Sequence, residues 1–220
     1  MFSPKHVRRF PFLTHYIICM KRLKISQGLR KLLIIAVLLA PVVAGAHPGF
    51  PGHTHGFANG FAHPFSGLDH LLAMLAIGIW AVQRGGRALW LAPLAFLSVM
   101  TVGGFIGMAG FGQPPLLEQA IAASVLIFGI LIATMAPVSL RAGISVIGLF
   151  ALFHGYAHGA EMPATSSGLL YGLGFVLATA SLHFCGIGLG LVAQKTGAMK
   201  MVRCAGCLIA ACGLYLIFSA

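Results

Sequence analysis

Charged residues are scarce in this sequence. Only 8% of its 220 residues are Asp, Glu, Lys or Arg, whereas 59% are hydrophobic. A typical soluble domain has about a quarter charged residues. A water-soluble fold would therefore have too few charged side chains to cover its surface, and the composition indicates an integral membrane protein instead.

The basic residues do not form a surface for nucleic acid. The formal net charge is +11, which by itself would be compatible with a polyanionic partner. However, eight of the fourteen Lys and Arg residues precede residue 32: Lys5, Arg8, Arg9, Lys21, Arg22, Lys24, Arg30 and Lys31. The other six lie in or beside short segments between apolar runs, which is typical of residues that set membrane topology.

Cysteines are few, and they form no spaced extracellular framework. Four of the five lie inside apolar stretches, so we predict no disulfide scaffold. Cys204 and Cys207 form a C-x-x-C pair, which we interpret as small packing residues on a membrane helix rather than a thiol metal site or redox pair. The sequence also lacks G-x-x-x-x-G-K-[ST], so we expect no nucleotide bound through a P-loop.

The amino-terminal segment has the pattern of a signal peptide. Basic residues from 21 onward precede the apolar core 32–40, then Pro41 and the small residues Ala44-Gly45-Ala46. We predict cleavage after Ala46, with Met20 as an alternative start of translation. The other interpretation is an uncleaved anchor, but 32–46 is shorter than the about 20 residues that a span needs.

Six predominantly apolar runs follow that are long enough to cross a bilayer. They predict an all-α membrane protein with six transmembrane helices at 64–83, 88–109, 116–136, 142–160, 168–193 and 201–219. Residues 47–63 are expected to form a periplasmic His-rich leader, and residues 64–220 the six-helix domain.

The basic residues predict the orientation of these helices. With a periplasmic mature amino terminus, the first, third and fifth loops are cytoplasmic. These loops and the start of the last run carry every basic residue of the mature chain, as the positive-inside rule requires: Arg84, Arg87, Arg141, Lys195, Lys200 and Arg203.

The first polar motif starts before the first apolar run and extends into its beginning. It contains His47, His53 and His55, followed by His63, Pro64, Asp69 and His70. Proline suits a first helical turn, so we expect the helix to begin there, with residues 63 and 70 on one face. Imidazoles and a carboxylate suit nickel, cobalt, zinc or copper(II). Cleavage would also give His47 a free amine beside its imidazole, although a flexible leader without that role is the alternative.

The second polar motif lies at the end of the fourth apolar run. His154, His158 and Glu161 follow one another at spacings of four and three, so one helix face can offer three ligands to one ion. Ionisable groups within a bilayer are costly, about 2.5 to 3.5 kcal/mol for a charge at a helix centre. We therefore predict a metal or proton role for these residues. His183, deeper in the fifth run, is predicted to be a further ligand or relay; a structural hydrogen bond is the alternative.

These motifs resemble the HupE/UreJ family of nickel and cobalt permeases, which occur with hydrogenase and urease systems. The resemblance covers the mature start, the segment from His63 to His70, the segment from Phe153 to Glu161, and Leu182-His183-x-x-Gly186. It implies uptake of Ni2+ or Co2+ as transported substrate across the bacterial cytoplasmic membrane, for urease or hydrogenase assembly. It implies no enzymatic activity.

Two other functions are compatible with the same residues. Three protein ligands with an open position also describe an intramembrane zinc-dependent hydrolase. Histidines can also act as relays in a proton-coupled carrier or a metal sensor. The motifs do not decide between nickel and cobalt, or between urease and hydrogenase.

Overall fold

The computed structural model describes residues 56–112, 114–162 and 167–219. The predicted signal peptide, its cleavage site, and His47, His53 and His55 lie outside these residues. The described residues fall within one compact unit, Ala44–Ala220. All regular secondary structure in this part of the chain is helical, as the sequence predicts.

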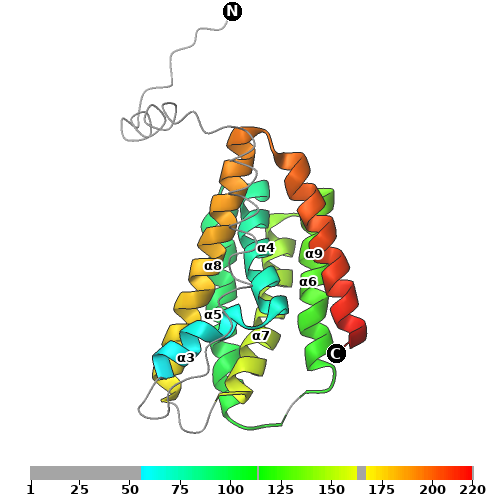
Figure 1. Cartoon of the computed structure of the whole chain (residues 1–220). Coiled ribbons are helices and arrows are strands. Elements are labelled where there is room, and N and C mark those ends of the chain that lie inside the picture. Colours follow the sequence, from blue (N-terminus) through cyan, green and yellow to red (C-terminus); the bar gives the residue numbers. More distant parts are fainter. Residues whose placement is uncertain (1–55, 113, 163–166, 220) are drawn as a thin grey trace, which may run out of the picture. The chain divides into compact units, whose positions relative to one another are not determined.

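A short helical segment precedes the long helices (Figure 1). It consists of α3 (Gly56–Ala62) and a single 3-10 turn, η2 (His63–Phe65). The long helices are α4 (Leu68–Arg84), α5 (Ala88–Met108), α6 (Leu117–Thr134), α7 (Leu140–Ala160), α8 (Gly168–Thr196) and α9 (Met199–Ser219).

Five helices, α5 to α9, are long and apolar enough to cross a membrane. This indicates a multi-pass membrane protein and agrees with the last five predicted runs. The segment Gly56–Phe65 and helix α4 together also pass this test, but they are bent by 77° relative to each other. The first predicted run, 64–83, therefore falls on a bent pair of helical segments and not on one straight helix.

The predicted beginning of the first long helix was wrong. Pro64 lies at the start of η2, and α4 begins only at Leu68, after Gly67 in an extended conformation with φ −96° and ψ 124°. Proline cannot donate a backbone hydrogen bond, and the extended glycine ends the helical path between η2 and α4. The chain therefore turns sharply here.

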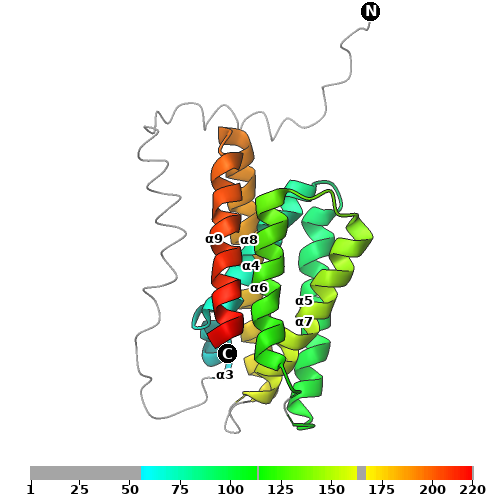
Figure 2. The same cartoon turned by 90° about the vertical axis from the view of Figure 1, so that its right-hand side faces the viewer.

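Helix α4 lies at the centre of the bundle and contacts each of the other five long helices (Figure 2). Two close helix pairs, α4 with α8 and α5 with α7, position the histidines. A Cβ atom on Gly186 of α8 would collide with the carbonyl oxygen of Leu75 on α4, and one on Gly155 of α7 with that of Met100 on α5. Such contacts between small residues and backbone are typical of membrane helix packing.

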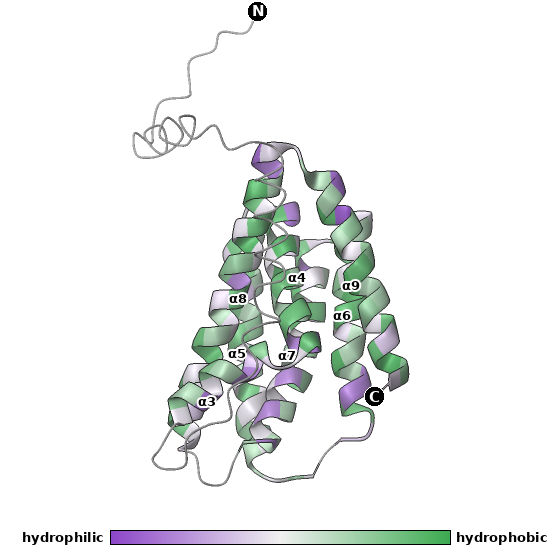
Figure 3. Cartoon of the chain, viewed as in Figure 1, coloured by the Kyte–Doolittle hydropathy of each residue, from purple (hydrophilic) through white to green (hydrophobic). Residues whose placement is uncertain are grey.

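The acidic and the basic residues of the described helices lie at opposite ends of the bundle. The carboxylate end, with α3 and η2, carries Asp69, Glu118 and Glu161. The basic end, where α4 and α8 finish, carries Arg84, Arg87, Arg141, Lys195, Lys200 and Arg203. Between the ends the helices are mainly hydrophobic (Figure 3), and large side chains such as Leu149, Phe184 and Leu208 are exposed.

Candidate metal site

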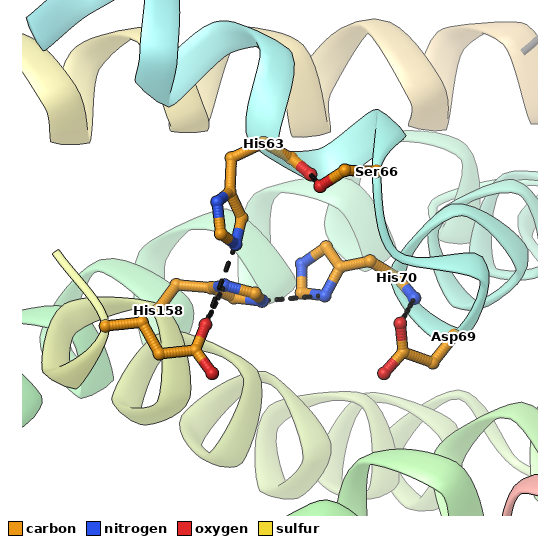
Figure 4. Close-up of polar contacts among 6 residues, drawn as sticks. His63, Ser66, Asp69, His70 and His158 are labelled. Carbon is orange, nitrogen blue, oxygen red and sulfur yellow. Dashed lines mark hydrogen bonds and ion pairs between the residues drawn. The ribbon is translucent and has the colours of Figure 1, made fainter. Parts of the chain in front are cut away.

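Three potential metal ligands meet at the carboxylate end. His63 lies on η2, whereas His158 and Glu161 lie at the end of α7. Glu161 Oε2 is 3.7 Å from Nε2 of His63 and 3.5 Å from Nδ1 of His158. One ligand atom from each residue lies within 4.8 Å of the others. We call His63, His158 and Glu161 the outer site; Figure 4 labels its two histidines.

His70 on α4 orients the imidazole of His158, which lies at the centre of this site. Its Nδ1 atom is 2.9 Å from Nε2 of His158, and the two rings meet edge to face with centroids 4.2 Å apart. This hydrogen bond leaves Nδ1 of His158 directed towards Glu161. Metal-binding histidines usually use their second nitrogen for such an orienting bond.

The bend between η2 and α4 brings His63 and His70 to opposite sides of His158. We expected these two residues to share one face of a continuous helix, but they lie on separate segments. The ring centroid of His63 is 4.6 Å from that of His158, in an edge-to-face contact. The three imidazoles therefore meet because the chain turns, not because of a seven-residue helical repeat.

His154 lies one turn deeper than His158 and does not join the outer site. Its Nδ1 atom is 2.9 Å from the carbonyl oxygen of Phe150, and its ring is 4.6 Å from that of His70. The predicted stripe of His154, His158 and Glu161 is present on α7, but only its last two residues are in the outer site. His183 lies farther along α8, with its ring 5.3 Å from that of Phe96.

Asp69 has a structural contact beside the site. Its Oδ1 atom accepts a hydrogen bond of 2.7 Å from the backbone N–H of His70. A carboxylate in the first turn of a helix is also favoured by the helix dipole. Asp69 thus stabilises the start of α4, which carries His70. Among the described residues it is not part of the three-ligand group.

Glu161 makes the end of α7 suited to a cation. It follows the last residue of the helix as its C-cap, and its backbone N–H donates a hydrogen bond to the carbonyl oxygen of Ala157. Helix carboxyl ends carry about half a negative charge, which disfavours a nearby carboxylate unless a cation is close. Contact with His158, above all, holds the pKa of Glu161 below its usual range. The ionised carboxylate and the helix end therefore both attract positive charge.

Two aromatic residues of α8 line the site, and we did not predict them. The Phe175 ring is 4.7 Å from that of His158 and 5.4 Å from that of His70. Tyr171 packs against His63 with ring centroids 6.0 Å apart. With Thr179 and His183 these residues recur every four positions along α8. That spacing was the sequence signal that could have identified this face.

A groove beside the outer site lies between α5, α7 and α8. Its volume is about 300 Å³. It is lined by side chains that include His158, Tyr171 and Phe175, together with Met100, Met108 and Met162. His158, only 13% exposed, thus lies between this groove and the buried ring of His70.

A family model described as HupE / UreJ protein matches residues 35–216. The chain belongs to the HupE / UreJ family. It is also 42% identical, over 183 residues, to Protein HupE of Rhizobium leguminosarum bv. viciae, covering 83% of this chain and 94% of that protein. No solved structure matches the chain. The family resemblance inferred from the motifs is therefore confirmed.

The ligand chemistry of this HupE / UreJ chain is that of a borderline divalent metal. Two imidazole nitrogens and one carboxylate oxygen can approach one ion in the outer site. Such mixed nitrogen and oxygen sets suit nickel, cobalt, zinc or copper(II), while magnesium and calcium prefer oxygen alone. The exposed fraction of Glu161, 43%, leaves one side of the site accessible from the carboxylate end.

Proposed function

We propose that this chain is a secondary permease that carries Ni2+ or Co2+ inward across the bacterial cytoplasmic membrane. The observation that supports this most strongly is the outer site, two imidazoles and a carboxylate within 4.8 Å at one end of an apolar helical bundle. Family membership supports the same conclusion. The delivered metal would serve the assembly of a urease or a hydrogenase.

The separation of charges supports an orientation with the carboxylate end in the periplasm. Lys and Arg concentrate in cytoplasmic loops, and all six basic residues of the described helices lie at the basic end. A cation arriving from outside would therefore meet Glu161 and the outer site first. Both mature termini would face the periplasm in this orientation.

The proposed route begins at the amino-terminal histidines. After removal of residues 1–46, the leader 47–63 would present His47, His53 and His55 for capture of the ion and transfer to His63. Asp69 and His70 would support the site from α4, and His154 and His183 would follow along the route. We expect residues 64–220 to form the permease domain.

The membrane potential can drive this movement without a nucleotide. Moving one charge through 100 mV is worth about 2.3 kcal/mol, so a divalent ion gains about 4.6 kcal/mol on reaching a negative interior. Facilitated or secondary transport would therefore be sufficient.

Nickel content of cells tests the proposal. Cells that express the chain should accumulate more nickel at limiting external concentration than cells without it, as measured by mass spectrometry. His158→Ala and His154→Ala should each lower this uptake by about tenfold or more, since even changes to residues that orient ligands cost 10 to 100-fold. Leu149→Ala, on the exposed face of α7, is the matched control and should leave uptake unchanged.

The same measurement separates the other functions. A zinc-dependent hydrolase would retain zinc after purification, while cellular nickel would not depend on the gene. A pure proton relay would purify without metal. Either result would contradict the permease proposal.

A further inference from the structure

Beneath the outer site, three histidines are enclosed by the helical bundle. His70 is 1% exposed, and His154 and His183 are 0% exposed. In the described part of the chain, no hydrogen-bond partner is present for Nε2 of His70, Nε2 of His154 or either ring nitrogen of His183. Buried polar atoms are normally paired. Four unpaired nitrogens within one apolar bundle therefore point to a ligand.

The rings follow one another from the outer site into the bundle. His158 contacts His70 at 4.2 Å between centroids, and His70 contacts His154 at 4.6 Å. Phe96 of α5 then lies 5.6 Å from His154 and 5.3 Å from His183. His183 lies eight residues beyond Phe175, or about 12 Å farther along α8. The series thus runs from the carboxylate end towards the middle of the bundle.

The hydrogen bonds of the upper histidines decide which of their ring nitrogens can bind a metal. A carbonyl oxygen can only accept, so Nδ1 of His154 donates to Phe150, and Nε2 keeps its lone pair for another partner. When Nδ1 of His158 binds an ion in the outer site, its Nε2 atom carries the proton and donates to Nδ1 of His70. Nε2 of neutral His70 then carries a proton as well, so His70 orients His158 and is not itself a ligand. A neutral imidazole held in the manner of His154 is a good ligand for nickel and cobalt.

We propose that His154 and His183 form a second, inner site that binds the same divalent ion through nitrogen ligands of the protein alone. This inference rests on the proposed function. The fully buried Phe96 ring contacts both His154 and His183. Among the described residues, only those of the outer site already converge within 4.8 Å. For both inner ligands to reach one ion, the Phe96 ring would have to move aside.

Helix α5 contains a feature that permits this movement. Pro93 lies inside the helix, three residues before Phe96. Because proline has no N–H, the backbone hydrogen bond to the carbonyl of Leu89 is missing at this turn, which allows the helix to bend. The inner site also differs chemically from the outer one. It contains no carboxylate, so the charge of a bound ion would be less compensated there than in the outer site.

Cobalt titration of the purified full-length chain in detergent tests the inner site. Bound metal is counted by mass spectrometry, and visible absorption distinguishes an all-nitrogen site from a mixed nitrogen and oxygen site. Wild type should bind two ions per chain. His183→Leu and His183→Gln should each bind one, with only the mixed-ligand spectrum. Using two variants separates loss of the ligand from loss of the fold.

Phe96→Ala tests the role of the ring. If the inner site forms only in a minor state, removing the ring should raise its apparent affinity by about tenfold or more. Phe128→Ala is the matched control, because Phe128 is also buried, on α6, and packs against Phe150. It should not change the affinity.

Two results would contradict the inner site in different ways. One ion in wild type, with the same count and spectrum in both His183 variants, would overturn the inner site while leaving the outer site and the proposed function intact. No bound ion in wild type would overturn both.

Discussion

Nε2 of His158 lies 2.9 Å from Nδ1 of His70, so one hydrogen bond joins the end of α7 to the beginning of α4. The two residues are 88 positions apart in the sequence. The bond fixes the plane of the His158 ring between His63 and the interior of the bundle. It therefore connects the accessible ligands of the outer site to the buried histidines.

We expect His70→Ala to weaken nickel binding at the outer site by about 10 to 100-fold, because orienting partners of metal ligands have effects of this size. Titration of the purified chain with nickel measures the dissociation constant. Ser181→Ala, on the exposed side of α8, is the control and should bind normally. Equal affinity in His70→Ala and wild type would show that His70 does not orient His158.

The contact between α4 and α8 should depend on one glycine and not on its neighbour. A methyl group on Gly186 would meet the backbone of Leu75, whereas one on Gly188 would meet nothing within 4 Å. Gly186→Ala should cost about 1 to 3 kcal/mol, as overpacking does. Gly188→Ala should be neutral or stabilising by up to about 1 kcal/mol, because alanine favours helix over glycine. Thermal unfolding in detergent compares the two, and equal melting temperatures would contradict this packing.

Much of the fold follows from the sequence because hydrophobic run length and short polar loops are local signals. Helices α5 to α9 match their predicted runs closely. The bend before α4 was not predicted, since proline at 64 is compatible with a helix start and only Gly67 in its extended conformation shows where the path breaks.

The sequence identified individual residues of the site but not how they are arranged in space. His158 and Glu161 are close because they share a helix turn, which spacing reveals. His158 contacts His63, His70 and Phe175 only because η2, α4 and α8 meet the end of α7 in the folded protein. No periodicity in one segment contains that information. The separation of His154 from the outer site likewise depends on how α5 and α7 pack.

The orientation of the bundle can be tested with reporters. An alkaline phosphatase fusion after Arg87, at the basic end, should be inactive, and a fusion after Ala220 should be active, because the basic end is expected in the cytoplasm. A cytoplasmic reporter should give the reverse pattern. Phosphatase activity at Arg87 would place the basic end outside and contradict the proposed direction of transport.

We also predict that the mature amino terminus takes part in capture. An α-amine with a pKa near 7.7 to 8.0 and an imidazole near 6.5 are both readily deprotonated by a competing metal. Inserting two residues between Ala46 and His47 should lower uptake at limiting nickel, because His47 then loses its free amine. Protein sequencing must confirm the new terminus. Unchanged uptake would show that the amine contributes nothing.

The central claim is that the outer site binds the metal that the chain transports. Uptake of radioactive nickel into liposomes that contain only the purified chain, under an imposed inside-negative potential, tests it most directly. We predict uptake by wild type, a loss of about tenfold or more in Glu161→Gln, and partial recovery in Glu161→Asp, because a charged carboxylate ligand is required. Uptake by Glu161→Gln equal to that of wild type would contradict the outer site as the transport site, and no uptake by wild type would contradict the permease function itself.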